Sequence, residues 1–101
     1  MSEYTSGPRE DYGRTMPHDN QAEQSVLGGM MLSKDAIADV VEVLRGVDFY
    51  KPAHENIYDA VVSLYGRGEP ADAITVGDEL TKNGEMERIG GIAYLHSLIA
   101  S

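Results

Sequence analysis

Apolar residues recur along the chain three or four positions apart, with polar residues between them. This spacing places the apolar side chains on one face of a helix, which can pack against the rest of a fold. Five stretches show it, and we expect helices that begin near Asn20, Ser33, Pro52, Thr75 and Gly90. No stretch of useful length alternates apolar and polar residues as a half-buried strand does. The pattern predicts an all-α fold, a compact single domain of about five short helices.

Several residues at the ends of these stretches match the preferences of helix termini. Asn20 and Glu23 have the spacing of a capping box, with Asn in place of the usual Ser or Thr. Ser33 is a suitable N-cap for the second helix. Pro52 fits the first turn of the third helix, because the N–H that proline lacks would be unpaired there. The sequence thus predicts three helix starts from local chemistry.

Two other boundaries rest on fewer signals. Arg45 followed by Gly46 is typical of a helix end, with a base in the last turn and then glycine. Thr75 is the expected cap of the fourth helix, and the preceding link, residues 69–74, is expected to be short and extended. We therefore predict a second helix that reaches residue 45 and a fourth that begins after residue 75.

The first predicted helix contains two adjacent glycines, Gly28 and Gly29, in its middle. Together they sacrifice about 2 kcal/mol of helix preference relative to alanine. Small residues let another backbone approach closely, and the neighbouring Met30 and Met31 have flexible side chains that fill irregular gaps. This stretch predicts either a crossing with another helix of the same chain or a contact with a second subunit.

The length of 101 residues suits one domain. Residues 1–18 are polar and show no hydrophobic period, so we expect a flexible N-terminal tail before a globular head, residues 19–101. No apolar run approaches the roughly 20 residues that span a bilayer, and the start has no apolar segment typical of a secretory signal. Cysteine is absent. These features favour a cytoplasmic protein with no membrane contact.

The net charge of −9 is the most informative bulk property. From residue 19 onward, fourteen acidic side chains accompany six basic ones, and the basic residues occur singly. Proteins that bind nucleic acids gain most of their affinity by neutralising phosphates with clustered Lys and Arg. We therefore expect little or no direct nucleic-acid binding by this chain.

The residues that could carry chemistry do not form a recognisable site. The chain has no Gly-Lys pair of the kind that ends a phosphate-binding loop. Its three histidines lie more than thirty residues apart, unlike the paired ligands of a zinc site. His54 lies at the start of a helix, so we expect it to be exposed to solvent or to cap that helix. We expect Asp78 and Glu79 to form a solvated acidic face. We predict no catalytic residue, metal site or cofactor site.

Four blocks of the sequence carry a resemblance to a known family. In chain order they read "AEQSVLGGMMLS", "DFYKPAHENIYDAVVSLYGRGEPAD", "ITVGDEL" and "IGGIAYLHSLI". Together they closely resemble the N-terminal domain of the bacterial replicative DNA helicase, the DnaB family. The resemblance covers about residues 16–101, and four ordered blocks at the family's spacing make it specific.

The resemblance implies a non-catalytic part of a larger machine. In the family this helical head is followed by a helical hairpin and by a RecA-like motor that binds ATP and Mg²⁺ and moves on DNA as a homohexamer. We expect the hairpin and the motor to be missing here. The head is expected to form a collar with other helicase subunits and to dock primase.

The resemblance also suggests a residue for primase binding. The family's contact involves the hairpin and the last helix of the head, where Tyr94 is the matching aromatic residue and Leu95 is expected to be core. Gly29 and Gly77 occupy positions at which relatives often have alanine. A close helix crossing that tolerates alanine does not require glycine, so such a crossing does not fully explain Gly29.

Two other functions remain open at this stage. One is the helicase-binding domain of primase, a module that resembles this head in fold, although the blocks "AEQSVLG" and "DFYKPAH" favour the helicase. The other is a small DNA-binding regulator, which the negative charge argues against.

Overall fold

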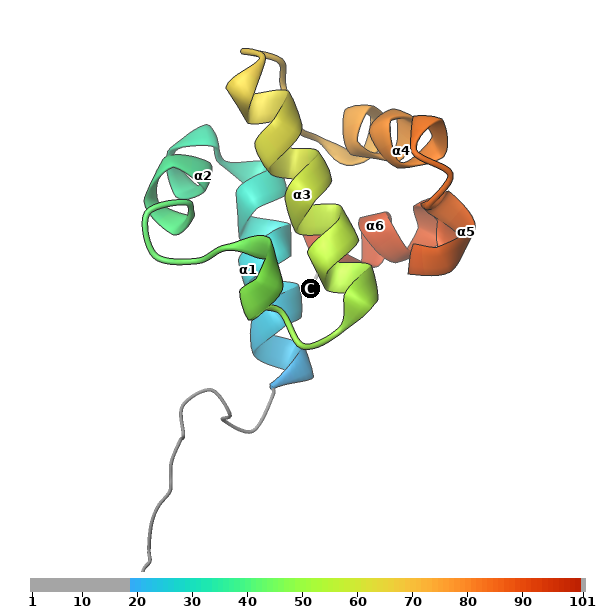
Figure 1. The fold of residues 1–101 in the computed structure, drawn as a ribbon, viewed down its shortest axis with the longest axis horizontal. Coiled ribbons are helices and arrows are strands. Elements are labelled where there is room, and N and C mark those ends of the chain that lie inside the picture. The colour runs from blue at the N-terminus through green and yellow to red at the C-terminus, as the bar shows by residue number, and fades with distance from the viewer. Residues whose placement is uncertain (1–18, 101) are drawn as a thin grey trace, which may run out of the picture.

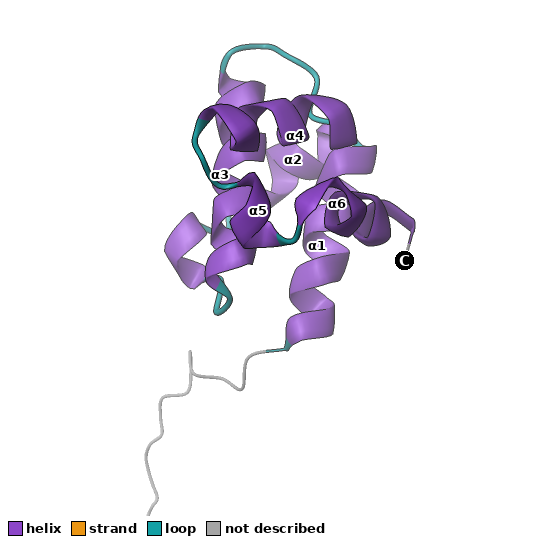
Figure 2. Ribbon diagram, turned by 90° about the vertical axis from the view of Figure 1, so that its right-hand side faces the viewer, coloured by secondary structure: helices purple, strands orange, loops and turns teal. Residues whose placement is uncertain are grey.

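The computed structural model describes residues 19–100, so the tail expected over residues 1–18 lies outside the described residues. The described part is all-helical, as the hydrophobic pattern predicts, and Figure 2 shows helices joined by loops without a strand among them. The elements in chain order are α1 (Asn20–Leu32), α2 (Lys34–Val40), the 3₁₀ helix η1 (Gly46–Asp48), α3 (Pro52–Gly66), α4 (Ala73–Lys82), α5 (Met86–Ile89) and α6 (Gly91–Ala100).

The third helix, α3, runs through the middle of the fold (Figure 1). It contacts α1 and α2 on one side and α4 and α5 on the other, while α6 packs against α1 and α4. The core between these helices is mainly aliphatic. Its fully buried large side chains, other than one histidine, are Leu27, Met30, Ile57, Val61, Val76, Leu80 and Leu95.

Some helix starts agree with the sequence analysis. The Ser33 hydroxyl accepts a hydrogen bond from the Ala36 N–H and caps α2, and Pro52 is in the first turn of α3. The cap of α1 is Asp19 instead of Asn20, because the Asp19 carboxylate accepts the Ala22 N–H. The expected Asn20–Glu23 capping box is therefore wrong, which leaves the Glu23 carboxylate available for other partners.

The fourth helix begins earlier than expected. Asp72 is the cap of α4, since its carboxylate accepts the Ile74 and Thr75 N–H groups. The Thr75 hydroxyl in turn accepts the Asp72 N–H at 2.8 Å, which completes a capping box. Thr75 is thus the third residue of the helix and not its cap. Asp72 already binds the N–H groups of residues 74 and 75, so the helix begins before Thr75 can act as its cap.

Two other boundaries differ from the prediction. The second helix, α2, ends at Val40, five residues before Arg45, and the chain continues as turns into η1. The β-branched residues Val40, Val41 and Val43 lose side-chain freedom in a helix, which favours an early end. A one-turn helix, α5, precedes α6, and Gly90 separates the two with a backbone φ of 108°. This left-handed conformation is accessible to glycine without strain.

The acidic pair on α4 is only half solvated. Asp78 is exposed, but Glu79 is buried and accepts a hydrogen bond from the Arg67 guanidinium at 2.9 Å. Hydrogen bonds from Arg67 lower the pKa of Glu79 below its ordinary value, against the opposing effect of burial. The expected solvated acidic face is thus wrong at Glu79, because a base at the end of α3 reaches across to α4.

The two adjacent glycines of α1 have different surroundings. A Cβ added at Gly28 would overlap the carbonyl oxygen of Leu98, so α6 crosses α1 in direct backbone contact. A Cβ added at Gly29 would meet no atom within 4 Å. Only Gly28 is therefore required for this crossing, and its lost helix preference is offset by close packing.

Alanine substitutions at these two positions should have opposite effects. We expect Gly28→Ala to lower the free energy of unfolding by about 2 kcal/mol or more, because α6 would have to move. We expect Gly29→Ala to raise it by up to about 1 kcal/mol through helix preference. Urea unfolding followed by circular dichroism measures both, and equal effects at the two positions would contradict this account of the crossing.

Candidate functional site: an interhelical cluster around Tyr94

The α6 residue Tyr94 is half-buried, and its hydroxyl group is turned toward other helices. The Tyr94 oxygen lies 2.6 Å from Nε2 of His54 on α3 and accepts a hydrogen bond of 3.2 Å from the Gln24 amide on α1. The His54 and Tyr94 rings are nearly parallel, with centroids 5.9 Å apart and an interplanar angle of 11°. We name Glu23, Gln24, His54 and Tyr94 the interhelical cluster.

His54 is completely buried, with an exposed fraction of 0%. Its Nδ1 lies 2.7 Å from the Glu23 carboxylate, opposite the ring nitrogen that faces Tyr94. The expectation of a solvated or capping His54 is therefore wrong. Its position in the first turn of α3 suggested exposure, but α1 and α6 contribute the side chains that cover it.

The hydrogen-bond partners determine where the protons of the cluster lie. An ionised carboxylate only accepts hydrogen bonds, so His54 Nδ1 carries a proton and donates it to Glu23. Because the Tyr94 oxygen already accepts from Gln24, the Tyr94 O–H can donate to an unprotonated Nε2 of His54. A neutral imidazole with its proton on Nδ1 satisfies both ring nitrogens of His54 and the Tyr94 hydroxyl.

The Glu23 carboxylate also acts at the start of α3. It accepts the backbone N–H of Tyr50 at 2.7 Å, whereas Lys51, the residue that precedes α3, makes no cap bond with its own side chain. Burial raises the pKa of Glu23, but the Tyr50 N–H and the His54 side chain outweigh that effect and lower it below 4.5. A carboxylate from α1 thus stabilises the N-terminus of α3, where the helix dipole favours negative charge.

The structure places Gly28, Met30 and Met31 inside the fold, whereas Gly29 is partly exposed and faces open space. Gly28 faces α6 of the same chain, and Met30 and Met31 are buried in the core. Leu95 is fully buried, as expected. Of the candidate residues, only Tyr94 belongs to the interhelical cluster.

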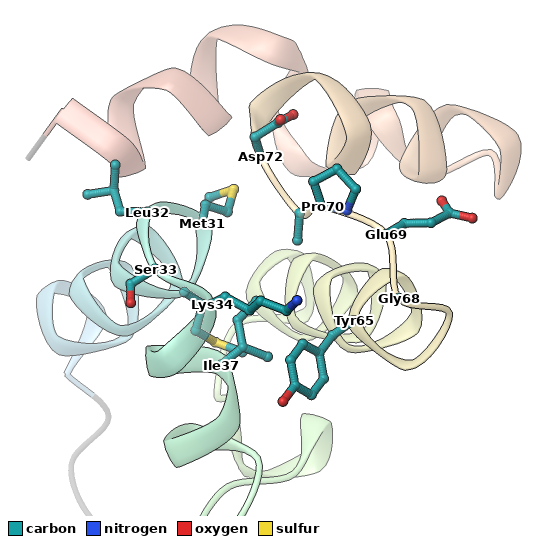
Figure 3. A pocket seen from close by; sticks show the side chains of 12 residues that line it. Met31, Leu32, Ser33, Lys34, Ile37, Tyr65, Gly68, Glu69, Pro70 and Asp72 are labelled. Atoms are coloured by element: carbon teal, nitrogen blue, oxygen red, sulfur yellow. The ribbon is translucent and has the colours of Figure 1, made fainter.

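A cavity of about 290 Å³ lies elsewhere, between the α1–α2 junction and the loop from α3 to α4. Figure 3 shows Met31, Ile37, Tyr65 and Pro70 around it, with the Lys34 side chain extending across it. The charged groups of the lining are Lys34, Glu69 and Asp72, and the last of these already caps α4. This lining is largely apolar and offers no paired acid and base for catalysis.

Other kinds of site have no support in the described part of the chain. Within residues 19–100, no group of three or more His, Asp or Glu side chains is placed to hold a metal ion. No helix there is long and apolar enough to cross a membrane. The large apolar side chains that are exposed within this range are Leu32, Val43, Val47, Tyr50, Ile74 and Ile92.

The hydrophobic pattern does not reveal His54 and Glu23 as members of a site. Their hydrogen bond joins residues 31 positions apart, and the bond from His54 to Tyr94 joins residues 40 apart. Helical periodicity carries no information about such pairs. One signal was available: three of the four blocks, "AEQ…", "…KPAH…" and "…AYL…", contribute one residue each to the Glu23–His54–Tyr94 contacts.

Comparison with known proteins identifies the family. Residues 15–101 match the family described as the DnaB-like helicase N terminal domain. The chain belongs to this family. Since the match includes all the described residues, the interhelical cluster lies within a DnaB-like N-terminal domain.

Two replicative helicases illustrate the similarity. The chain is 66% identical over 94 residues to "Replicative DNA helicase DnaB" of Mycobacterium leprae (strain TN), which covers 93% of this chain and 16% of the relative. It is 69% identical over 85 residues to the protein of the same name from Leifsonia xyli subsp. xyli (strain CTCB07), covering 84% and 19% respectively. The DnaB-like domain described here thus spans less than a fifth of the length of these curated relatives.

A solved structure supports the fold. The crystal structure of the N-terminal domain of DnaB helicase from Mycobacterium tuberculosis is similar, with a TM-score of 0.82 and 68% sequence identity. The similarity covers 83% of this chain and 58% of that chain. The all-α fold and the DnaB family, both expected from the sequence, are therefore confirmed.

Removal of the Glu23 charge should change how stability depends on pH. Because its pKa is lowered in the folded domain, Glu23 contributes stability that is present above pH 4.5 and lost as the pH falls through the folded value. We expect Glu23→Gln to lower the free energy of unfolding at pH 7 by about 1–2 kcal/mol, and this deficit to shrink below about pH 4.

Urea unfolding between pH 3 and pH 7 tests this expectation. Glu42→Gln is the matched control, because Glu42 is an exposed acid in the turn after α2. A deficit for Glu23→Gln that is equal at all pH values, or equal to that of the control, would contradict a stabilising role for the Glu23 charge.

Proposed function

We propose that this domain is a non-catalytic docking and assembly module of a replicative DNA helicase. In this proposal it binds primase through the surface of α6 around Tyr94 and contributes to a collar formed with other subunits of a homohexamer. ATP and Mg²⁺ would bind in the motor domain of the longer protein, which acts on DNA in the cytoplasm. The observation that carries the proposal is the anchored position of Tyr94 in a DnaB-like N-terminal domain.

The geometry of Tyr94 supports a docking role. Its hydroxyl is held by His54 and Gln24, so the ring is fixed before any partner arrives. A pre-ordered aromatic side chain loses little conformational entropy on binding, and tyrosine is frequent among the residues that dominate interfaces.

The charge of the domain supports a protein partner over DNA. The chain's net charge of −9 would repel phosphates, and the basic residues from residue 19 onward are scattered. We therefore propose that DNA contacts belong to the motor. The helicase relatives also favour the helicase reading over that of a helicase-binding domain of primase.

Loss of the Tyr94 side chain should weaken primase binding. We expect Tyr94→Ala to raise the Kd for purified primase by about tenfold, a change typical of an interface tyrosine that contributes strongly. Tyr65→Ala is the matched control, because Tyr65 is also half-buried but lies at the cavity near the end of α3. Isothermal titration calorimetry measures the affinity, and circular dichroism verifies that each variant is folded.

Two results would contradict the proposal. One is an unchanged Kd for a folded Tyr94→Ala domain, which would place primase elsewhere or exclude it as a partner. The other is salt-sensitive binding of single-stranded DNA by the wild-type domain in a parallel titration, which would favour the DNA-binding alternative.

A further inference from the structure

His54 occupies a buried position, where a histidine ring needs hydrogen-bond partners for its nitrogens. It is fully buried, and each of its ring nitrogens is bonded to a side chain of a different helix, Glu23 on α1 and Tyr94 on α6. A buried polar ring remains stable only when its groups are paired. The imidazole is therefore a fixed link between α1, α3 and α6.

The Tyr94 hydroxyl depends on this link more than on its other partner. The bond to His54 is 2.6 Å long, whereas the bond from the Gln24 amide is 3.2 Å long. Gln24 donates to the Tyr94 oxygen, so it does not receive the hydroxyl proton. With its own proton on Nδ1, His54 offers Nε2 as the acceptor for that proton in the cluster.

Glu23 in turn fixes the imidazole. It binds Nδ1 with one carboxylate oxygen and the Tyr50 N–H with the other, so the bond to His54 is held against the start of α3. This arrangement prevents the ring from flipping, and it keeps Nε2 directed at α6.

We infer that His54 is a positioning residue for partner binding: it holds the Tyr94 ring in the orientation that α6 presents to primase. This inference rests on the proposed function, because it assigns to His54 the pre-ordering of the tyrosine proposed to bind. It predicts that affinity follows the His54–Tyr94 bond and not the presence of a polar group at position 54.

Two substitutions separate the two bonds of His54. The amide of glutamine reaches as far as Nε2 of histidine, so His54→Gln can retain a partner for Tyr94. The shorter amide of asparagine reaches only as far as Nδ1, so His54→Asn can retain the bond to Glu23 but not the bond to Tyr94. Both variants keep a neutral amide in the buried site, which makes each the control for the other.

The position of Tyr94 is measured first without a partner. The chain contains six tyrosines, and ¹³C labelling of their rings with Tyr94→Phe as the reference assigns the Tyr94 signals in NMR spectra. We expect His54→Gln to leave the Tyr94 ring shifts close to those of the wild type. We expect His54→Asn to move them toward the values of a solvent-exposed tyrosine.

Titration with purified primase provides the second readout. We expect the Kd of His54→Gln to stay within about twofold of the wild type and that of His54→Asn to rise at least about fivefold. If both variants change the Tyr94 shifts and the Kd equally, or if neither changes the Tyr94 shifts, the inference is overturned.

If the proposed function is wrong but the inference about His54 is right, the same experiments give a different combination of results. If the Tyr94 shifts respond as expected but neither His54 variant nor Tyr94→Ala alters primase affinity, His54 positions Tyr94 and the proposed primase contact is wrong. If His54→Asn does not fold, the wild-type domain supplies the test. A Tyr94 hydroxyl proton protected from exchange, with a cross-peak to the His54 ring, supports the inference, and a rapidly exchanging one overturns it.

Discussion

The arrangement of the helices depends on one partly buried carboxylate. Glu23 has a side-chain exposure of 15%, and it satisfies both the backbone at the start of α3 and the ring of His54. The N–H that it accepts belongs to Tyr50, two residues before α3 begins, so a side chain of α1 holds the segment that leads into α3. This interaction places α1 and α3 at a defined distance and direction from each other.

The sixth helix is held against the same pair by two further contacts. His54, which is bound to Glu23, is also hydrogen-bonded to Tyr94 of α6. The absence of a side chain at Gly28 lets α1 contact the backbone of α6 at Leu98. The first contact is polar and directional, whereas the second is a close approach of backbones. Together they fix α6 in position and rotation, so the same residues that stabilise the fold also determine which side of α6 faces outward.

The sequence predicts the structural features that depend on residues close together in the chain. It does not reveal the features that depend on residues far apart in the chain. Helical periodicity predicts the five longer helices but not α5, and Ser33 and Pro52 mark two starts correctly because caps act within one turn. Asp19 and Asp72 were missed as caps because several polar residues competed at each start. The burial of His54 was missed because its partners come from α1 and α6. The role proposed for Tyr94 rested on family resemblance, and chain periodicity could not supply it.

The protonation state of the His54 ring tests most directly whether one hydrogen-bonded cluster joins α1, α3 and α6. The ¹⁵N chemical shifts of its two ring nitrogens in the folded domain at neutral pH report which of them carries the proton. The account predicts a protonated Nδ1 bound to Glu23 and an unprotonated Nε2 that accepts from Tyr94. A ring with its proton on Nε2, or one that averages between the two tautomers, would contradict it.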